Sequence, residues 1–424
     1  MKRFRFKTIL PLVPLLVLYM VIVSVFSADE IVADEGRHME YAYNLTQGYY
    51  TDAENPAIRN GPGYPLVMAP FVKLGIPNIV IKLLNGIFLF IAVIYFFLII
   101  SRYLSPKRAI AITYLFGLYP PLLKWISLMH SEALAVLLVC GFLYYFLKVF
   151  DRSAKRARYI VLSSFFLGYL TLTKVIFGYV ILASILFYLV VFLIGKSEKI
   201  KRTLIVLVGA FVMCIPYLYH TYSLTGKLFY WGTQGGEVLY WRSTPFSKEY
   251  GDWISSGVVL NTSEHDYYDT SEVVKNHGAF FKSLEPYSAV ERDALFKAKS
   301  IENMKEYPLK YIKNTSASAL RLFFNYPYSY TTQKTSTYFY IFPNALLVTF
   351  LSIAIVLALR NLRAILFEIR FLGVISLLFI GGLVLLDGRV RHLIPILPLL
   401  LVFMVYIFKH LVVLSIKKVN EEVI

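Results

Sequence analysis

The sequence predicts an all-helical protein that crosses a membrane many times. Hydrophobic residues make up 58% of the 424 residues, and the mean hydropathy of +0.61 is far above that of an ordinary soluble protein. Tyr and Phe occur 33 times each, and such aromatic abundance is typical of side chains at membrane interfaces. Apolar windows long enough to cross the hydrocarbon core also recur along the chain.

About ten windows have the roughly 20 apolar residues that a membrane helix needs. They lie at residues 9–27, 78–100, 109–128, 132–150, 159–173, 175–195, 203–221, 337–359, 370–386 and 393–413. The two windows between 159 and 195 form one stretch too long for a single crossing, so we expect a hairpin that turns at Lys174. The first window lacks a convincing cleavage site and is interpreted as a retained signal anchor.

Positive charge predicts the orientation of these spans. The net charge is +17, and Lys and Arg cluster near both chain ends and in the short loops 101–108, 151–158, 196–202 and 360–368. Basic loops of this kind face the cytoplasm. We therefore expect a multi-pass protein of the plasma or inner membrane with both termini cytoplasmic. The same clusters serve as topology signals, so no nucleic-acid partner is expected.

This orientation divides the chain into three parts. An N-terminal membrane module (1–221) contains the first outer loop (28–77), an outer periplasmic or extracellular segment follows (222–336), and residues 337–424 form C-terminal helices and a short tail. Within the outer segment, 288–308 predicts an amphipathic helix that ends at a proline, and 309–324 predicts a helix lying in the membrane interface. Cys140 and Cys214 lie in apolar runs, which indicates packing rather than a disulfide or zinc site.

The first outer loop is the most acidic part of this basic protein, with four carboxylates at Asp29, Glu30, Asp34 and Glu35. Carboxylates at the mouth of a membrane helix are costly unless they face water, a cation or a substrate. The pattern turns helical at Ala33 and is expected to stop at Gly48. Asp34 either caps this helix by accepting a hydrogen bond from a backbone N–H or serves as a general base beside Glu35.

Other polar residues lie at the same outer ends of distant spans, at Glu132, Lys174, Arg389 and Arg391. Glu132 either follows a capping Ser131 in a first helical turn or binds substrate. Lys174 either reaches the lipid headgroups or meets a partner, since a cation in a largely apolar stretch is expensive. The two arginines oppose the positive-inside rule and are suited to binding a phosphate. One external site could gather all of these groups.

His38 lies four residues after Asp34 and would share its helical face. The imidazole could pair with a carboxylate, help to hold a metal, or have no role. The sequence has no HExxH or HxH spacing that would specify a metal site. No metal ligand is therefore assigned, and dependence on a divalent metal stays open.

These motifs together resemble the GT-C superfamily of membrane glycosyltransferases that use lipid-linked sugars, and most closely the protein O-mannosyltransferase and aminoarabinose transferase-like group (glycosyltransferase family 39). The similar features are Asp34-Glu35 before an amphipathic helix, the Pro-Gly-Tyr-Pro element at 62–65, Ser131-Glu132, the helix-then-proline stretch 291–308, and Arg391-His392 with Pro395 and Pro398. Where many relatives have Arg-Pro, this sequence has Thr173-Lys174-Val175. The phosphate partner could thus be Lys174 or another residue.

The resemblance implies a GT-C bundle and an inverting transfer of a hexose or pentose from a polyprenyl-phosphate donor at the outer face, with no redox cofactor. The acceptor would be a lipid, a protein or a polysaccharide. Asp34 would be the catalytic base, Lys174 and Arg391 would stabilise the departing phosphate, and Glu35, Glu132, Arg389, Tyr64 and His38 would complete the substrate site. Two rivals are a carrier or flippase for lipid-linked sugars and a catalytically silent GT-C relative.

Overall fold

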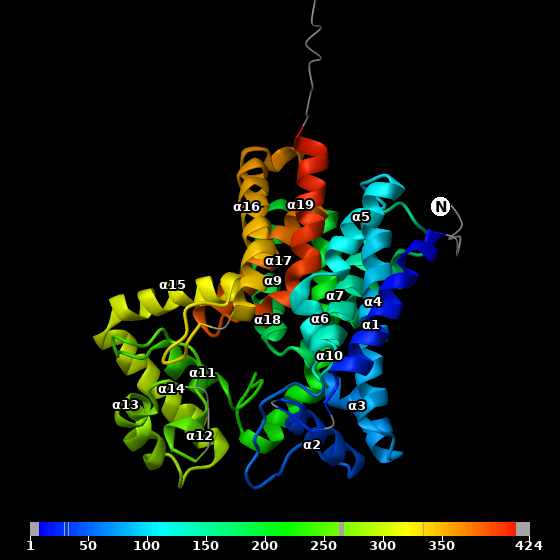
Figure 1. The fold of residues 1–424 in the computed structure, drawn as a ribbon. Coiled ribbons are helices and arrows are strands. Elements are labelled where there is room, and N and C mark those ends of the chain that lie inside the picture. Colours follow the sequence, from blue (N-terminus) through cyan, green and yellow to red (C-terminus); the bar gives the residue numbers. More distant parts are fainter. Residues whose placement is uncertain (1–7, 29, 33, 263–266, 334, 413–424) are drawn as a thin grey trace, which may run out of the picture.

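The computed structural model of the chain describes residues 8–28, 30–32, 34–262, 267–333 and 335–412 (Figure 1). This part of the chain consists of helices and loops without a strand, which confirms the all-helical prediction. Some residues named above lie outside the described ones, namely Asp29, Ala33 and the basic residues near both chain ends.

Seven helical stretches of the described chain are long and apolar enough to cross a membrane, judged by length and composition. They are α4 (Asn78–Ile100), α7 (Glu132–Val149), α9 (Ile176–Gly195), α10 (Glu198–Thr225), α16 (Tyr338–Arg360), α17 (Phe367–Leu385) and Val390–Leu411. The last stretch comprises α18 (Val390–Leu393), η5 (Ile394–Ile396) and α19 (Leu397–Leu411). Each of the seven corresponds to a predicted span, so the chain is a multi-pass membrane protein.

The predicted span 109–128 is not one continuous helix. It divides into α5 (Pro106–Gly117) and α6 (Pro120–Trp125). Tyr119 precedes Pro120 and adopts an extended conformation, with φ −61° and ψ 118°. A residue before proline is driven out of the helical region by steric clash, so the break follows directly from the sequence.

Two other predicted spans form helices that are not among the seven. α1 (Val13–Phe26), preceded by η2 (Leu10–Leu12), belongs to an apolar helical stretch below the length of the others. α8 (Arg156–Thr173) begins with two arginines and carries several Ser and Thr residues. The turn between α8 and α9 lies at Lys174, as predicted.

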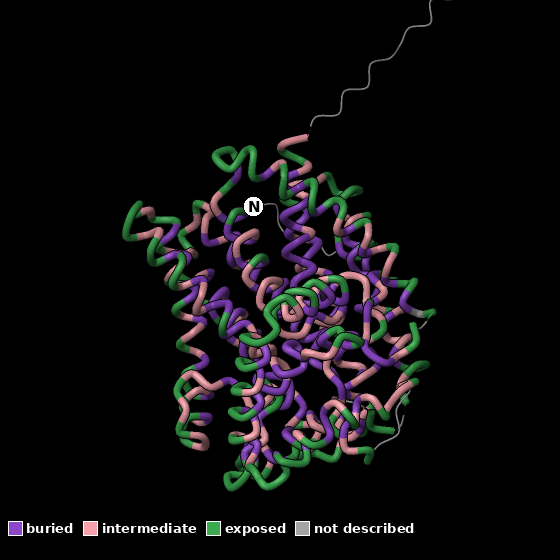
Figure 2. The backbone as a smooth tube through the Cα atoms, turned by 90° about the vertical axis from the view of Figure 1, so that its left-hand side faces the viewer, coloured by how far each residue is buried: buried purple, intermediate pink, exposed green. Residues whose placement is uncertain are grey.

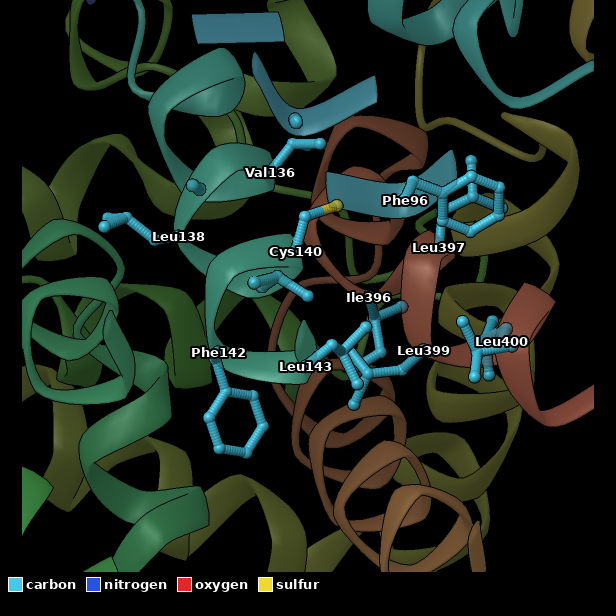
Figure 3. Packing of buried hydrophobic residues seen from close by; sticks show 14 of the residues in the cluster. Phe96, Val136, Leu138, Cys140, Phe142, Leu143, Ile396, Leu397, Leu399 and Leu400 are labelled. Carbon is cyan, nitrogen blue, oxygen red and sulfur yellow. The ribbon is translucent and has the colours of Figure 1, made fainter. Parts of the chain in front are cut away.

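The core of the bundle is built around α7. This helix packs against α4 and α8, and 78% of its span is buried, compared with 28% for α16 at the periphery. Figure 3 shows Cys140 and Leu143 of α7 beside Ile396 and Leu399 from the start of the last span. Cys140 and Cys214 are both free and fully buried, which confirms that they serve packing.

The first outer loop contains α2 (Glu35–Thr46) and α3 (Gly63–Lys73), which pack against each other. Gly61, which lies just before α3, and Gly63, the first residue of α3, allow the loop to approach the end of α8. A Cβ atom added at Gly61 would lie 2.1 Å from the carbonyl oxygen of Leu172, and one at Gly63 would lie 2.3 Å from Oγ1 of Thr173. Any side chain at these positions would separate the loop from the turn that carries Lys174.

The outer segment has its own hydrophobic core, which includes Tyr240, Trp241, Phe281 and Phe296. Its helices are α11 (Gly235–Arg242), α12 (Ser256–Val259), α13 (Thr270–Ser283), α14 (Ala289–Glu306) and α15 (Pro308–Phe324). A capping box of Ser288 and Glu291 starts α14, and Pro308 separates it from α15, so both predicted helices are present. Figure 2 shows buried residues in the interior of the molecule and exposed residues mainly at its periphery.

Candidate active site

A cavity of about 290 Å³ lies where the first outer loop, the start of α7, the α8–α9 turn and the start of α18 meet. Six of the eight predicted site residues line it, namely Asp34, His38, Glu132, Lys174, Arg389 and Arg391. They come from four segments that are widely separated in the sequence. The tertiary structure therefore gathers most of the predicted polar residues into one place.

Asp34 stands at the start of α2, but it does not cap the helix with its side chain. Its Oδ1 accepts a hydrogen bond from the Arg37 guanidinium, and its Oδ2 accepts one from Nη1 of Arg391 at 2.9 Å. The capping alternative is thus wrong, because two arginines bind the carboxylate. Burial by itself would raise the pKa of Asp34, but the charges of Arg391 and Arg37 outweigh this effect and lower the pKa well below its usual range.

Glu132 begins α7 and pairs with Lys174, so of the two alternatives for this lysine the structure shows the one in which it meets a partner. Nζ of Lys174 donates to Oε1 of Glu132 at 2.9 Å, and Nδ1 of His130 lies 3.7 Å from Oε2. Ser131 makes no side-chain capping bond, so Glu132 is held by these side chains and not by a capping motif. Because Lys174 and Glu132 both line the cavity, the pair is available to a ligand.

The two predicted arginines are supported by tryptophan rings. The Arg389 guanidinium lies 5.5 Å from the ring centre of Trp253, and its Nε is 2.9 Å from Oδ2 of Asp387. The Arg391 guanidinium lies 5.6 Å from the ring centre of Trp125. Contacts of this kind hold a guanidinium over an aromatic face without using its N–H donors.

His38 is buried and forms part of an aromatic cluster behind Asp34. Its ring centre lies 5.1 Å from that of Tyr64 and 6.4 Å from that of His130. Among the described residues, Nδ1 of His38 has no hydrogen-bond partner. Burial, with smaller contributions from His130 and Lys174, lowers the pKa of His38 to about 3, so its imidazole is neutral at neutral pH. Tyr64 does not line the cavity; its hydroxyl donates to Oδ1 of Asn85.

Glu35, predicted to bind substrate, does not line the cavity either. Its side chain is fully buried, and its oxygens accept hydrogen bonds from the backbone N–H groups of Met129 at 2.7 Å and Val32 at 2.9 Å. Nζ of Lys82 lies 3.4 Å away. The prediction for Glu35 is therefore corrected, since its carboxylate is used to fix the turn before α7, next to His130.

Five cationic and three carboxylate side chains line the cavity, an excess of two positive charges. Several residues that line the cavity were missed by the sequence prediction, namely Arg37, Arg59, His130 and Asp387. His130 directly precedes Ser131-Glu132, and Asp387 lies in the same short loop as Arg389. Their closeness in the sequence to predicted site residues could have identified them. Among the described residues, no group of three or more His, Cys, Asp or Glu side chains is arranged to hold a metal ion.

Comparisons with known proteins agree with this architecture. Residues 59–220 match the model of the family described as dolichyl-phosphate-mannose-protein mannosyltransferase. The archaeal oligosaccharyltransferase AglB from Archaeoglobus fulgidus, solved with an inhibitory peptide and a dolichol-phosphate, is similar with a TM-score of 0.50 and 13% identity, over 96% of this chain and 50% of AglB. ArnT from Cupriavidus metallidurans, bound to undecaprenyl phosphate, is similar with a TM-score of 0.41 and 14% identity, over 95% of this chain and 76% of ArnT. No curated protein matches the sequence.

The resemblance to the GT-C membrane glycosyltransferases is thereby confirmed, by the family match over 59–220 and by the fold shared with AglB. The chain spans about half the length of AglB, and at this identity the similarity concerns the fold. The matched segment contains Glu132 and Lys174, but Asp34 and Arg391 lie outside it. Their roles are therefore argued from the cavity itself.

Proposed function

We propose that this chain, which has the fold of the GT-C membrane glycosyltransferases, transfers a sugar from a polyprenyl-phosphate donor to an acceptor hydroxyl. The observation that carries the proposal is the meeting of Asp34, Lys174 and Arg391 in one cavity with an excess of positive charge. A carboxylate beside cations is the arrangement needed to deprotonate a hydroxyl and to stabilise a departing phosphate.

The proposed reaction is a direct displacement. The acceptor oxygen attacks the anomeric carbon from the face opposite the phosphate, and Asp34 takes up the proton of the hydroxyl. The bond between the anomeric carbon and the phosphate oxygen breaks, and its electron pair stays on the polyprenyl phosphate. The configuration at the anomeric carbon is inverted. The acceptor is a lipid, a protein or a polysaccharide, and the sugar is a hexose or a pentose.

The excess of positive charge suits this change in the donor. A phosphodiester carries one negative charge, and the phosphomonoester that leaves carries about 1.5 to 2 near neutral pH. Lys174 and Arg391 are the cations assigned to this phosphate, and the neighbouring Arg389 extends the basic wall of the cavity. Cationic hydrogen-bond donors that are fixed where the negative charge develops stabilise the transition state more than they stabilise the bound substrate.

The basic loops favour a cytoplasmic location for both termini, so the cavity would face the outer side of the plasma or inner membrane. A carrier or flippase for lipid-linked sugars is the main rival. Transporters place ionisable groups near the middle of the bilayer, in broken helices. Here the ionisable residues lie at helix ends and in loops, beside the outer segment, which favours chemistry at a membrane surface.

The decisive experiment measures transfer from a panel of radiolabelled polyprenyl-phosphate sugars in proteoliposomes, with a crude acceptor extract. The native chain is compared with Asp34→Asn and with Asp52→Asn, which alters an exposed carboxylate of the same loop. Use of one donor by the native chain and by Asp52→Asn, but not by Asp34→Asn, would support the proposal. No turnover of any donor by a folded native chain would favour a carrier or a catalytically silent relative.

A further inference from the structure

The proposed base and one of the proposed phosphate ligands are bound to each other. Nη1 of Arg391 lies 2.9 Å from Oδ2 of Asp34, and the two residues are separated by 357 positions in the sequence. Both side chains line the cavity and are about one-fifth exposed, at 21% and 20%. Because the pair is accessible from the cavity, a bound ligand can reach either member.

The two proposed roles cannot be performed while this ion pair is intact. A carboxylate whose oxygens accept hydrogen bonds from two arginines is a weak base, and the lowered pKa of Asp34 reflects this. Likewise, an arginine that donates to a carboxylate offers fewer N–H groups to a phosphate. The structure therefore describes a state in which Asp34 and Arg391 neutralise each other.

We propose that the phosphate of the donor competes with Asp34 for Arg391, so that donor binding frees the Oδ2 oxygen of the carboxylate that serves as the base, while Arg37 stays on Oδ1. This inference rests on the proposed function and adds an order to it, with the donor entering before the acceptor is deprotonated. The negative charge of the bound phosphate also makes the neighbouring carboxylate a stronger base. Without a donor, Asp34 stays paired and inactive.

Arg391 is better placed than Lys174 and Arg389 to change partner. Lys174 is bound to Glu132 at 2.9 Å, and Arg389 lies between Asp387 and the ring of Trp253. Apart from Asp34, the charged group of Arg391 contacts the face of Trp125, and its Nε has no hydrogen-bond partner among the described residues. An aromatic face holds a guanidinium in many orientations, so Arg391 can turn toward a phosphate and keep this contact.

The competition predicts that loss of the base tightens binding of the phosphate. We would measure the Kd of undecaprenyl phosphate for the full chain in detergent by calorimetry at neutral pH. Asp34→Asn should bind it about tenfold more tightly than the native chain, which corresponds to about 1.4 kcal/mol. Arg391→Gln should bind it more weakly, and adding Asp34→Asn to Arg391→Gln should leave the Kd unchanged. Asp52→Asn controls for a general effect of removing one negative charge from the loop.

The double-variant comparison separates the possible outcomes. Tighter binding by Asp34→Asn that disappears in the Arg391→Gln background supports the competition. Unchanged or weaker binding by Asp34→Asn, or equal tightening in both backgrounds, overturns the competition but leaves the proposed function standing. A folded native chain that binds no undecaprenyl phosphate at all overturns the proposed function and this inference together. Melting temperatures of all variants establish that they are folded.

Discussion

Arg391 and Arg242 both lie near the junction of the outer segment and the helical bundle, yet their surroundings differ. Arg242 ends α11, is fully buried, and donates to the carbonyl oxygens of Leu386 and Asn314 and to the hydroxyl of Ser318, at 2.9, 2.7 and 2.7 Å. Arg391 donates to one carboxylate oxygen and faces a cavity. Arg242 therefore connects α11, α15 and the end of α17. The guanidinium of Arg391, in contrast, has further N–H groups that are not used in hydrogen bonds to backbone carbonyl groups.

The difference gives a criterion that separates an arginine held by the fold from one that we propose binds a ligand. Backbone carbonyl groups cannot leave an arginine without disturbing the helices that carry them, so the contacts of Arg242 are permanent. A carboxylate on a side chain can be replaced by the oxygens of a phosphate, which match a guanidinium equally well. Substitutions of Arg242 and Arg391 test this distinction, and changes at Asp34 and His38 test the cavity that Arg391 faces.

The largest effect is expected for Asp34→Asn. An amide cannot accept the proton of the acceptor, and loss of a general base typically reduces a rate by about 10²- to 10⁴-fold. The rate of sugar transfer in proteoliposomes measures this loss, and the melting temperature should change little. Transfer within about threefold of the native rate would exclude Asp34 as the base.

Arg242→Ala should instead damage the fold. Its removal takes a donor from the carbonyl oxygens of Leu386 and Asn314 and from the hydroxyl of Ser318 in a buried place. The hydroxyl still accepts a hydrogen bond from the N–H of Gly388, so the main cost comes from the two carbonyl oxygens, at about 1 to 3 kcal/mol for each unsatisfied group. We expect a loss of about 3 kcal/mol in the free energy of unfolding, measured by chemical denaturation in detergent. Arg391→Ala is the matched control and should lose less than about 1 kcal/mol, because its partners can be hydrated from the cavity. Equal losses in the two variants would contradict the distinction.

Arg391→Ala should chiefly affect the donor. A hydrogen bond to a charged group contributes about 1.5 to 3 kcal/mol, so the KM for the donor should rise about 10- to 100-fold. The KM for the acceptor should stay within about twofold. Steady-state kinetics with each substrate varied in turn measures both values. An unchanged donor KM would show that the phosphate binds elsewhere.

The smallest effect concerns the pH dependence of stability. The pKa of His38 is about 3 in the folded chain and about 6.5 in an unfolded chain. As the pH falls below 6.5, the unfolded state takes up a proton that the folded state does not, so stability falls by about 1 kcal/mol per pH unit. Thermal unfolding of native protein and His38→Gln between pH 6.5 and 4 should show a shallower slope for the variant. His410→Gln, which alters an exposed histidine, should keep the native slope.

The elements that depend on local pattern could be predicted well. The span at α4, the turn at Lys174 and the α14 helix before Pro308 lie close to their expected positions. The break between α5 and α6 was missed although Pro120 and Pro121 stand in the sequence. The window 109–128 was predicted as one helix from its high hydropathy alone. The two prolines predict a break there, because proline removes a helical hydrogen bond.

Two neighbouring residues of the first loop show what could not be predicted from the sequence, namely which side chain faces the cavity. Asp34 and Glu35 are adjacent and carry the same chemical group, and both were assigned to the site. Adjacent residues on a helix point about 100° apart, so only one of the two could face the cavity. Packing of α2 turned Glu35 toward Lys82 and the N–H of Met129, and left Asp34 at the cavity.

The sequence by itself determined the helical membrane class and the presence of unusual polar residues at the ends of several spans. Hydropathy and charge belong to each residue and can be summed over a window, so no contact needs to be known. The tertiary structure alone decided that Asp34 meets Arg391, that Lys174 meets Glu132, and that Glu35 is excluded from the cavity. Hydrogen bonds and ion pairs act over a few ångströms, and such distances are set only when helices far apart in the sequence pack together.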